Sequence, residues 1–125
     1  MDYSMVHGCV PLARHHVQRE LTAWQWAGDQ NNAAVIVSEL VTNAINHARV
    51  AGHTLCVRLA LLEDSSILIE VADPVGAFRN FDEYITGDSD KECGRGLLII
   101  RALGGNLSWS PRTTRGKTVR VRLGP

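Results

Sequence analysis

The spacing of hydrophobic residues changes along this chain, and the change separates predicted helices from predicted strands. Over residues 11–26 and about 33–48, apolar residues recur every three or four positions, which is typical of one face of an α-helix. Residues 55–61 and 67–71 instead alternate with a period of two, as β-strands do. The turn-forming residues 63–66 lie between these two strands and predict an antiparallel hairpin.

The second half of the chain begins with a long polar connection and then resumes a regular pattern. Residues 73–94 show no periodicity, and loops of this length in compact domains are usually functional or disordered. A short helix is predicted over 95–103, and Gly104 and Gly105 end it. Two more strands, 106–110 and 117–123, then form a second hairpin.

This order of elements favours one architecture. Hairpins need no crossover helix, so we expect a mixed, mostly antiparallel sheet with the helices packed on one face. The fold class is therefore α+β, a two-layer α/β sandwich. At 125 residues, the chain is predicted to form a single domain over 1–125, with a core of about 11–123.

Composition and charge narrow the range of partners and locations. Thirteen basic and thirteen acidic side chains cancel, so neither nucleic acid nor a membrane surface is expected as the main partner. No apolar run reaches the roughly 20 residues that cross a bilayer, and the first residues do not resemble a signal peptide. We therefore expect a cytoplasmic protein. Three widely spaced cysteines argue against a disulfide framework or a structural zinc site.

The polar face of the second helix carries the first candidate site. Glu39, Asn43 and His47 are spaced four residues apart and form one stripe along the helix. The stripe can be an ordinary solvated face, but Asn is a middling helix former whose amide competes with the backbone, so its position suggests a bond made elsewhere. An amide oxygen suits Mg²⁺, and a carboxylate one turn away can accept a proton.

Two further segments carry residues typical of ligand binding. Asp73 leaves an apolar strand and is followed by Pro74, Val75 and Gly76, which fits either a plain turn or a fixed acceptor at the mouth of a pocket. The sequence Gly94-Arg95-Gly96-Leu97 opens a helix, where free N–H groups can hold phosphate. Taken alone this second signal is weak, because glycines before helices are common.

The sequence Gly116-Lys117-Thr118 resembles the end of a P-loop but does not fit that motif. A P-loop needs glycine five positions before Gly116, and Pro111 stands there. The residues that follow alternate as a strand, where a P-loop would begin a helix. We therefore exclude a P-loop.

Together, these segments resemble the GHKL ATPases, the superfamily of DNA gyrase, the 90-kilodalton heat-shock chaperones, mismatch-repair ATPases and sensor histidine kinases. Residues 38–48 resemble the N box, residues 73–76 and 94–97 the two glycine boxes, and residues 116–118 the final strand segment. The resemblance implies a Bergerat-type ATP-binding fold that covers most of the chain. A second glycine of the first box is missing, and the short segment before Pro11 leaves room for only a reduced edge strand.

The resemblance assigns roles to the residues of the helix stripe and of the first glycine box. It implies that Asn43 coordinates Mg²⁺ bridging the phosphates of ATP and that Glu39 is the catalytic general base. Asp73 would accept a hydrogen bond from the adenine amino group, and the carbonyl of guanine would be mismatched there. His47 would approach the phosphates or ribose, and Gly76 would contact the nucleotide.

The remaining assignments come from the second glycine box and the last strand. The resemblance implies that Gly94, Arg95 and Gly96 meet the phosphates, that Leu97 completes this binding segment, and that Thr118 helps to hold the adenine. The loop over residues 76–93 would be a lid ordered by nucleotide.

Within the superfamily, residues 39–44 and 94–97 resemble the anti-sigma-factor serine kinases and related small bacterial ATP-binding regulators. The resemblance implies a serine/threonine protein kinase that uses ATP and Mg²⁺, sequesters a sigma factor and phosphorylates an antagonist protein. The alternative is a non-catalytic module that controls a partner by binding ATP. The sequence identifies neither the partner nor the oligomeric state, and a homodimer stays open.

Overall fold

A computed structural model of the chain describes residues 1–78 and 92–125, with side chains described outside 79–95. Three helices are present in these parts: α1 (Cys9–Ala23), α2 (Gln30–Ala48) and α4 (Glu92–Ala102). The strands are β1 (Asp2–Ser4), β2 (Thr54–Leu61), β3 (Ile67–Asp73), β4 (Asn106–Pro111) and β5 (Lys117–Leu123). The lid predicted over 76–93 lies almost wholly outside the described residues.

The strands form one five-stranded sheet in the order β1-β2-β3-β5-β4. Every described pairing is antiparallel, so the expected mostly antiparallel sheet is confirmed. The pairing of β3 with β5 joins segments far apart in the chain, and its register sets Asp73 opposite Lys117. This central pairing brings the end of β3 and the start of β5 to the same edge of the molecule.

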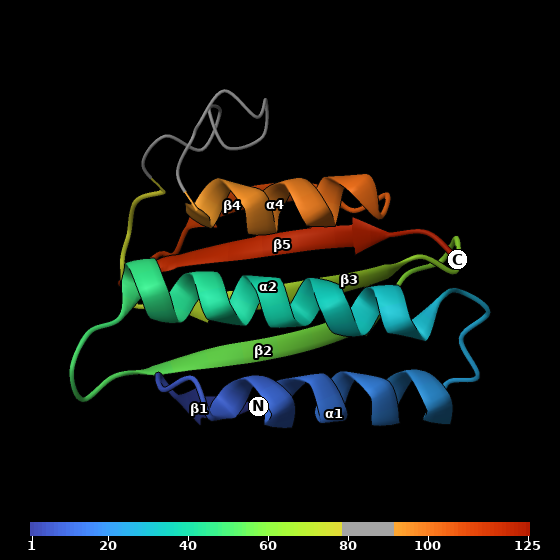
Figure 1. The fold of residues 1–125 in the computed structure, drawn as a ribbon, viewed down its shortest axis with the longest axis horizontal. Helices are drawn as coiled ribbons and strands as arrows, with labels where there is room; N and C mark the ends of the chain where they lie inside the picture. Colours follow the sequence, from blue (N-terminus) through green and yellow to red (C-terminus); the bar gives the residue numbers. More distant parts are fainter. Residues whose placement is uncertain (79–91) are drawn as a thin grey trace.

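The three helices lie side by side on one face of the sheet, as Figure 1 shows. Helix α2 lies in the middle and contacts both α1 and α4 as well as strands β3 and β5. The predicted apolar face of α2 is buried against the sheet, and its members are Val37, Leu40, Val41, Ala44, Ile45 and Ala48. The α+β two-layer sandwich expected from the sequence is therefore confirmed.

Local chemistry explains where α2 begins and where α4 ends. The Asp29 side chain accepts hydrogen bonds from the backbone N–H groups of Asn31 and Asn32 at 2.9 and 3.1 Å, so Asp29 caps α2. Helix α4 ends at Ala102, and Gly104 follows with φ of 88°, a conformation that favours glycine. Local interactions therefore explain the start of α2 and the end of α4.

The N-terminal segment is short but still contributes an edge strand. Tyr3 pairs with Leu55 of β2, and Tyr3 is itself buried. Helix α1 also begins at Cys9, two residues before the predicted start, and ends before Trp26. Trp26 instead lies in the core and donates its Nε1–H to the carbonyl oxygen of Ser65 at 2.7 Å.

Candidate functional site

A cavity of about 730 Å³ lies between the C-terminal half of α2 and the adjoining ends of β3 and β5. Its lining combines apolar side chains with amide, imidazole, carboxylate and ammonium groups. The described lining residues are Leu40, Asn43, Ala44, His47, Ala48, Val71, Asp73, Val75, Gly76, Ala77, Phe78, Lys117 and Val119. A cavity of this size with a few converging polar groups is typical of a small-molecule site.

Two of the three residues of the α2 stripe line this cavity. Asn43 is half-buried and His47 is exposed, and both contribute to the wall. Glu39 is half-buried and lies toward α4 instead, because a Cβ added at Gly96 would meet its Oε2 atom at 2.5 Å. The Glu39 carboxylate therefore lies against the backbone of α4 and is not among the cavity residues just named.

The end of β3 supplies the carboxylate of the cavity, and both oxygens of this group have a polar partner. Lys117 Nζ lies 3.0 Å from Oδ1 and 2.9 Å from Oδ2 of Asp73, in an ion pair whose side chains are 6% and 1% exposed. The backbone N–H of Val75 also donates to Asp73 Oδ1, at 2.9 Å. Burial raises the pKa of the Asp73 carboxyl, and the hydrogen bond from Lys117 opposes that rise.

Gly116 allows β5 to start close to the end of β3. Its φ of 83° lies in the left-handed region, and a Cβ at this position would overlap the carbonyl oxygen of Asp73. The carbonyl oxygen of Gly116 accepts from the backbone N–H of Arg112 at 2.8 Å, which closes the turn from β4. Glycine at 116 is thus what lets Lys117 face Asp73 across the sheet.

The structure brings Lys117, not Thr118, into the cavity. Side chains alternate along a strand, and Lys117 shares the buried, helix-facing side of β5 with Val119 and Val121. Thr118 lies between Lys117 and Val119, so its side chain lies on the other face of the sheet, and it is not among the residues that line the cavity. The alternation of Val119 and Val121 in the sequence was the signal that could have identified Lys117.

The second glycine box lies at the start of α4. Gly94 and Arg95 fall within this helix, but their side-chain surroundings are outside the described residues. Gly96 is half-buried beside Glu39, whereas Leu97 is 2% exposed and belongs to the hydrophobic core. Leu97 also borders a smaller cavity of about 280 Å³ together with Arg101 and Leu107.

An aromatic side chain closes one side of the cavity near the ion pair. The ring of Phe78 lies 5.7 Å from Lys117 Nζ, within the range of a cation–π contact. Its centroid is 6.3 Å from that of Trp109 on β4, with the two planes tilted by 41°. This side of the cavity is therefore partly apolar, and Lys117 is the cation in direct contact with Asp73.

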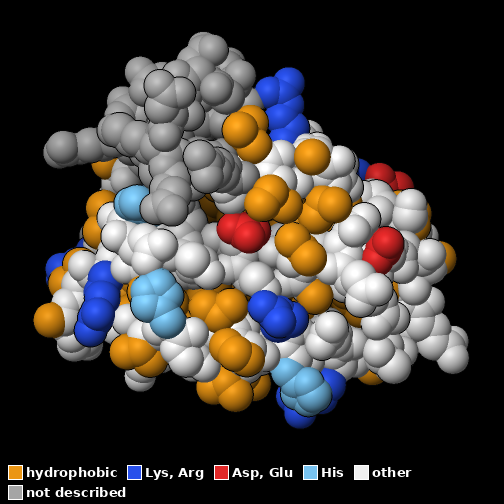
Figure 2. Space-filling view, in the orientation of Figure 1, with side chains coloured by type: hydrophobic (Ala, Val, Ile, Leu, Met, Phe, Trp, Pro, Cys, Tyr) orange, Lys and Arg blue, Asp and Glu red, His pale blue; other side chains and the backbone are white. Residues whose placement is uncertain are grey.

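No single type of side chain dominates the helix-bearing face around the site. In Figure 2, hydrophobic, charged and histidine side chains are intermixed on that face. Among the described side chains, those of residues 1–78 and 96–125, no group of three or more His, Cys, Asp or Glu could hold a metal ion. None of the helices in that part is long and apolar enough to cross a membrane.

Sequence comparison identifies the family. Residues 8–123 match the family described as "Histidine kinase-like ATPase domain". The match covers nearly the whole chain, so the chain belongs to this family of ATPase domains, and the expected GHKL relationship is confirmed. Among curated proteins, none matches the sequence significantly.

Solved structures share the fold. The histidine kinase domain of the Erythrobacter litoralis EL346 blue-light activated histidine kinase superposes with a TM-score of 0.54 at 21% identity, covering 75% of this chain and 43% of that one. A structure of the Erythrobacter litoralis EL346 blue-light activated histidine kinase superposes with a TM-score of 0.55 at 23% identity, covering 75% of this chain and 31% of that one. Full-length ShkA, solved in complex with AMPPNP, superposes with a TM-score of 0.57 at 14% identity, covering 94% of this chain and 29% of that one. The chain thus spans less than half of each of these proteins.

Proposed function

We propose that the 730 Å³ cavity binds ATP together with Mg²⁺. The observation that carries this proposal is that Asn43 of α2 and Asp73 and Gly76 after β3 line one cavity in a domain of an ATPase family. The cavity falls within the roughly 300–1,000 Å³ of small-molecule sites. It is also partly apolar, as a nucleobase requires.

The residues around the cavity fit the two ends of a nucleotide. The base would lie in the part of the cavity lined by Asp73 and Phe78, and Asn43 would offer its amide oxygen to Mg²⁺. Mg²⁺ usually takes only one or two protein ligands together with phosphate oxygens and water, so a single amide oxygen is compatible with nucleotide-dependent binding. His47, on the same wall, would lie toward the ribose or phosphates.

The start of α4 is suited to the phosphates. The backbone N–H groups at a helix N-terminus favour anions, and the sequence Gly94-Arg95-Gly96 lies in the first turns of α4. Leu97, buried in the core, anchors this turn of α4 to the rest of the domain. Glu39 lies beside Gly96, and it would therefore lie at the phosphate end of the proposed site.

The reaction we propose is phosphorylation of a serine or threonine hydroxyl on a partner protein. Bound Mg-ATP would supply the phosphoryl group and part of the charge neutralisation. Glu39 would accept the proton of the attacking hydroxyl, which makes the oxygen a better nucleophile. The role of Arg95 would be to stabilise negative charge that develops on the transferred group.

The partner class we propose is the sigma-factor system, with the antagonist protein as phosphoryl acceptor. This rests on the likeness of residues 39–44 and 94–97 to the anti-sigma-factor serine kinases. Sigma factors, their antagonists and ATP occur together in the bacterial cytoplasm, so the protein would act there. Mass measurement of the purified chain with and without Mg-ATP would show whether it acts as a homodimer.

The proposed catalysis is tested by comparing the wild type with Glu39→Gln. Both proteins are incubated with Mg-ATP labelled on the γ-phosphate and with dephosphorylated cell extract, and ATP affinity is measured separately by calorimetry. We expect Glu39→Gln to keep its affinity within about threefold and to lose about 10²–10⁴-fold in phosphoryl transfer, the usual contribution of a general base. The label should be recovered on serine or threonine of an acceptor protein.

Two results would contradict the kinase proposal in different ways. Label found on histidine would indicate a histidine kinase reaction instead. Equal, negligible turnover by both proteins with intact ATP affinity would mean that ATP is only a conformational ligand.

A further inference from the structure

Lys117 forms an ion pair with the Asp73 carboxylate, the group from which an adenine base would need a hydrogen bond. Asp73 Oδ1 already accepts from Lys117 Nζ at 3.0 Å and from the N–H of Val75 at 2.9 Å, and Oδ2 lies 2.9 Å from Lys117 Nζ. The Asp73 side chain is 1% exposed, so little of the carboxylate faces the cavity. Because the Asp73 side chain is almost fully enclosed, an incoming amino group reaches the carboxylate only if a neighbouring group moves.

Lys117 is likewise satisfied by its surroundings. An ammonium group has three donors, and three oxygens lie within reach: both carboxylate oxygens of Asp73 and the carbonyl oxygen of Val75 at 3.3 Å. Its position is fixed by the register of β5 against β3 and by the turn at Gly116. The lysine stem nevertheless has four rotatable methylene groups, so the ammonium can leave the carboxylate when a ligand replaces its hydrogen bonds.

The pair also changes what the cavity can distinguish. A lone buried carboxylate would accept from the amino group of adenine and would be mismatched with the carbonyl oxygen of guanine. With Lys117 beside Asp73, the cavity offers a partner to both bases. The carboxylate can accept from the amino group of adenine, and the ammonium can donate to the carbonyl oxygen of guanine. The pair should therefore bind adenine less tightly than a free carboxylate and reject guanine less strongly.

We propose that Lys117 determines the base selectivity of this cavity by holding Asp73 in a buried ion pair that adenine must break. The proposal rests on the proposed function, because it concerns the base of the nucleotide bound there. It assigns a role to a residue that contacts the base region and takes no part in phosphoryl transfer.

The test titrates Mg-ATP and Mg-GTP into the wild type and Lys117→Ala in a calorimeter, after circular dichroism melts have shown that both are folded. We expect Lys117→Ala to bind ATP at least about tenfold more tightly, since a hydrogen bond to a charged group contributes about that much or more. The ratio of the GTP to the ATP dissociation constant should also rise at least about tenfold. An unchanged or weaker ATP affinity, or an unchanged ratio, would overturn the proposal.

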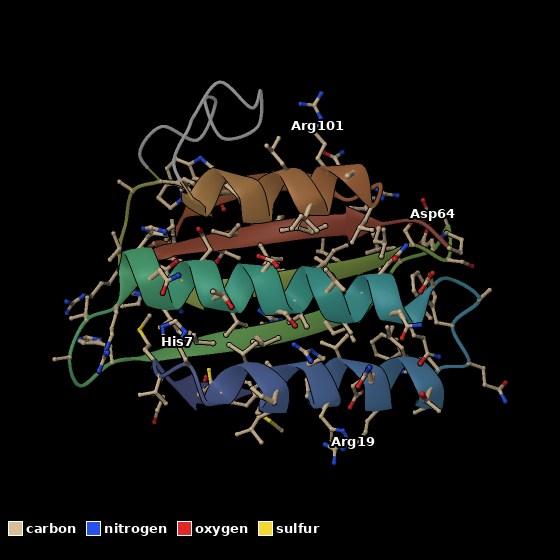
Figure 3. The ribbon with its side chains drawn as sticks, viewed as in Figure 1. His7, Arg19, Asp64 and Arg101 are labelled. Carbon is tan, nitrogen blue, oxygen red and sulfur yellow. The ribbon has the colours of Figure 1, made fainter. Side chains whose placement is uncertain are left out.

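Arg122→Ala is the matched control. Arg122 lies on the same strand and pairs with Asp64, but their side chains are 52% and 54% exposed. Figure 3 shows Asp64 at the opposite end of the sheet from the loop that follows β3. Arg122→Ala removes one cation from β5 just as Lys117→Ala does, and it should leave both nucleotide affinities within about twofold of wild type.

A second measurement titrates the wild-type protein, and a variant serves only to assign its signals. The chain has two lysines, Lys91 and Lys117, and nitrogen-15 labelling of lysine gives one ammonium signal for each, assigned with Lys91→Arg. Saturation with Mg-ATP should shift or broaden the Lys117 signal as the ammonium leaves Asp73. An unchanged Lys117 signal at saturating ATP would overturn the proposal, whereas failure of every protein to bind ATP would refute the proposed function itself.

Discussion

Replacing Gly96 with alanine should separate the stability of the domain from its catalysis. The added Cβ would lie 2.5 Å from Glu39 Oε2, and ordinary contact begins at 3.4 Å, so the carboxylate oxygen has to move by 3.4 − 2.5 = 0.9 Å. The atom that must move is the end of a flexible side chain, and this costs little. Alanine is also a better helix residue than glycine by about 1 kcal/mol in a helix interior. We therefore expect the free energy of unfolding to be unchanged or to rise by up to about 1 kcal/mol.

The effect on catalysis should be much larger than the effect on stability. A displacement of about 1 Å at a reacting group can lower a rate by about 10²-fold. Gly96→Ala should therefore lose about that factor in single-turnover ATP consumption, while its urea midpoint stays at or above that of the wild type. The assay is ADP formation with enzyme in excess over Mg-ATP.

A glycine that faces open space provides the control for this substitution. A Cβ at Gly8, the N-cap of α1, would meet no atom within 4 Å, and its φ of −61° is open to alanine. Gly8→Ala should keep wild-type turnover within about twofold. If Gly96→Ala also keeps turnover within threefold of wild type, Glu39 in this position is not the catalytic base.

Three further substitutions test the local arguments. Asp29→Ala removes the cap of α2 and should lower the free energy of unfolding by about 1 kcal/mol in urea titrations, and an unchanged midpoint would show that the two capping hydrogen bonds contribute nothing. Gly116→Ala forces a side chain into the left-handed region and against the Asp73 backbone, so it should lower the free energy of unfolding by more than about 2 kcal/mol and weaken ATP binding. Wild-type stability together with wild-type ATP affinity would mean that the close approach of β5 to β3 is not needed. His16 has a buried Nδ1 without a hydrogen-bond partner among the described atoms, and burial lowers its pKa. The folded pKa of His16 lies below its unfolded pKa, so its contribution to stability is present above the unfolded value of 6.5 and is lost as pH falls through the folded value. Below pH 6.5, the melting temperature of His16→Gln should therefore depend less on pH than that of the wild type. Parallel curves of melting temperature against pH would exclude the effect.

Much of the fold could be predicted because its helices and strands are encoded locally. The apolar face of α2 follows from the helical period around Val37 and Val41, and both hairpins follow from alternation between turn residues. The edge strand β1 was harder, since three residues show too little periodicity to distinguish a strand from a coil. Its formation depends on pairing with β2, far along the chain.

The candidate site was only partly predictable, and the reason is the pairing of β3 with β5. The sequence marked Asp73 and the segment at 116–118 as interesting, but the ion pair joins residues 44 positions apart. Which of Lys117 and Thr118 enters the cavity depends on the face of a strand, and a shift of one residue exchanges the two. The motif resemblance pointed to Thr118, whereas the register of β5 against β3 sets Lys117 opposite Asp73.

The most direct test of the account maps where Mg-ATP binds. Nitrogen-15-labelled protein is titrated with Mg-ATP, and the chemical shifts of backbone and side-chain amides are followed to saturation. We predict saturable shifts centred on the Asn43 side-chain amide and on the backbone amides of Asp73 and Gly76, with the α1 amides near Gly8 unchanged. Absence of shifts at millimolar Mg-ATP, or shifts centred on the smaller cavity beside Leu107, would contradict the assignment of the 730 Å³ cavity as the nucleotide site.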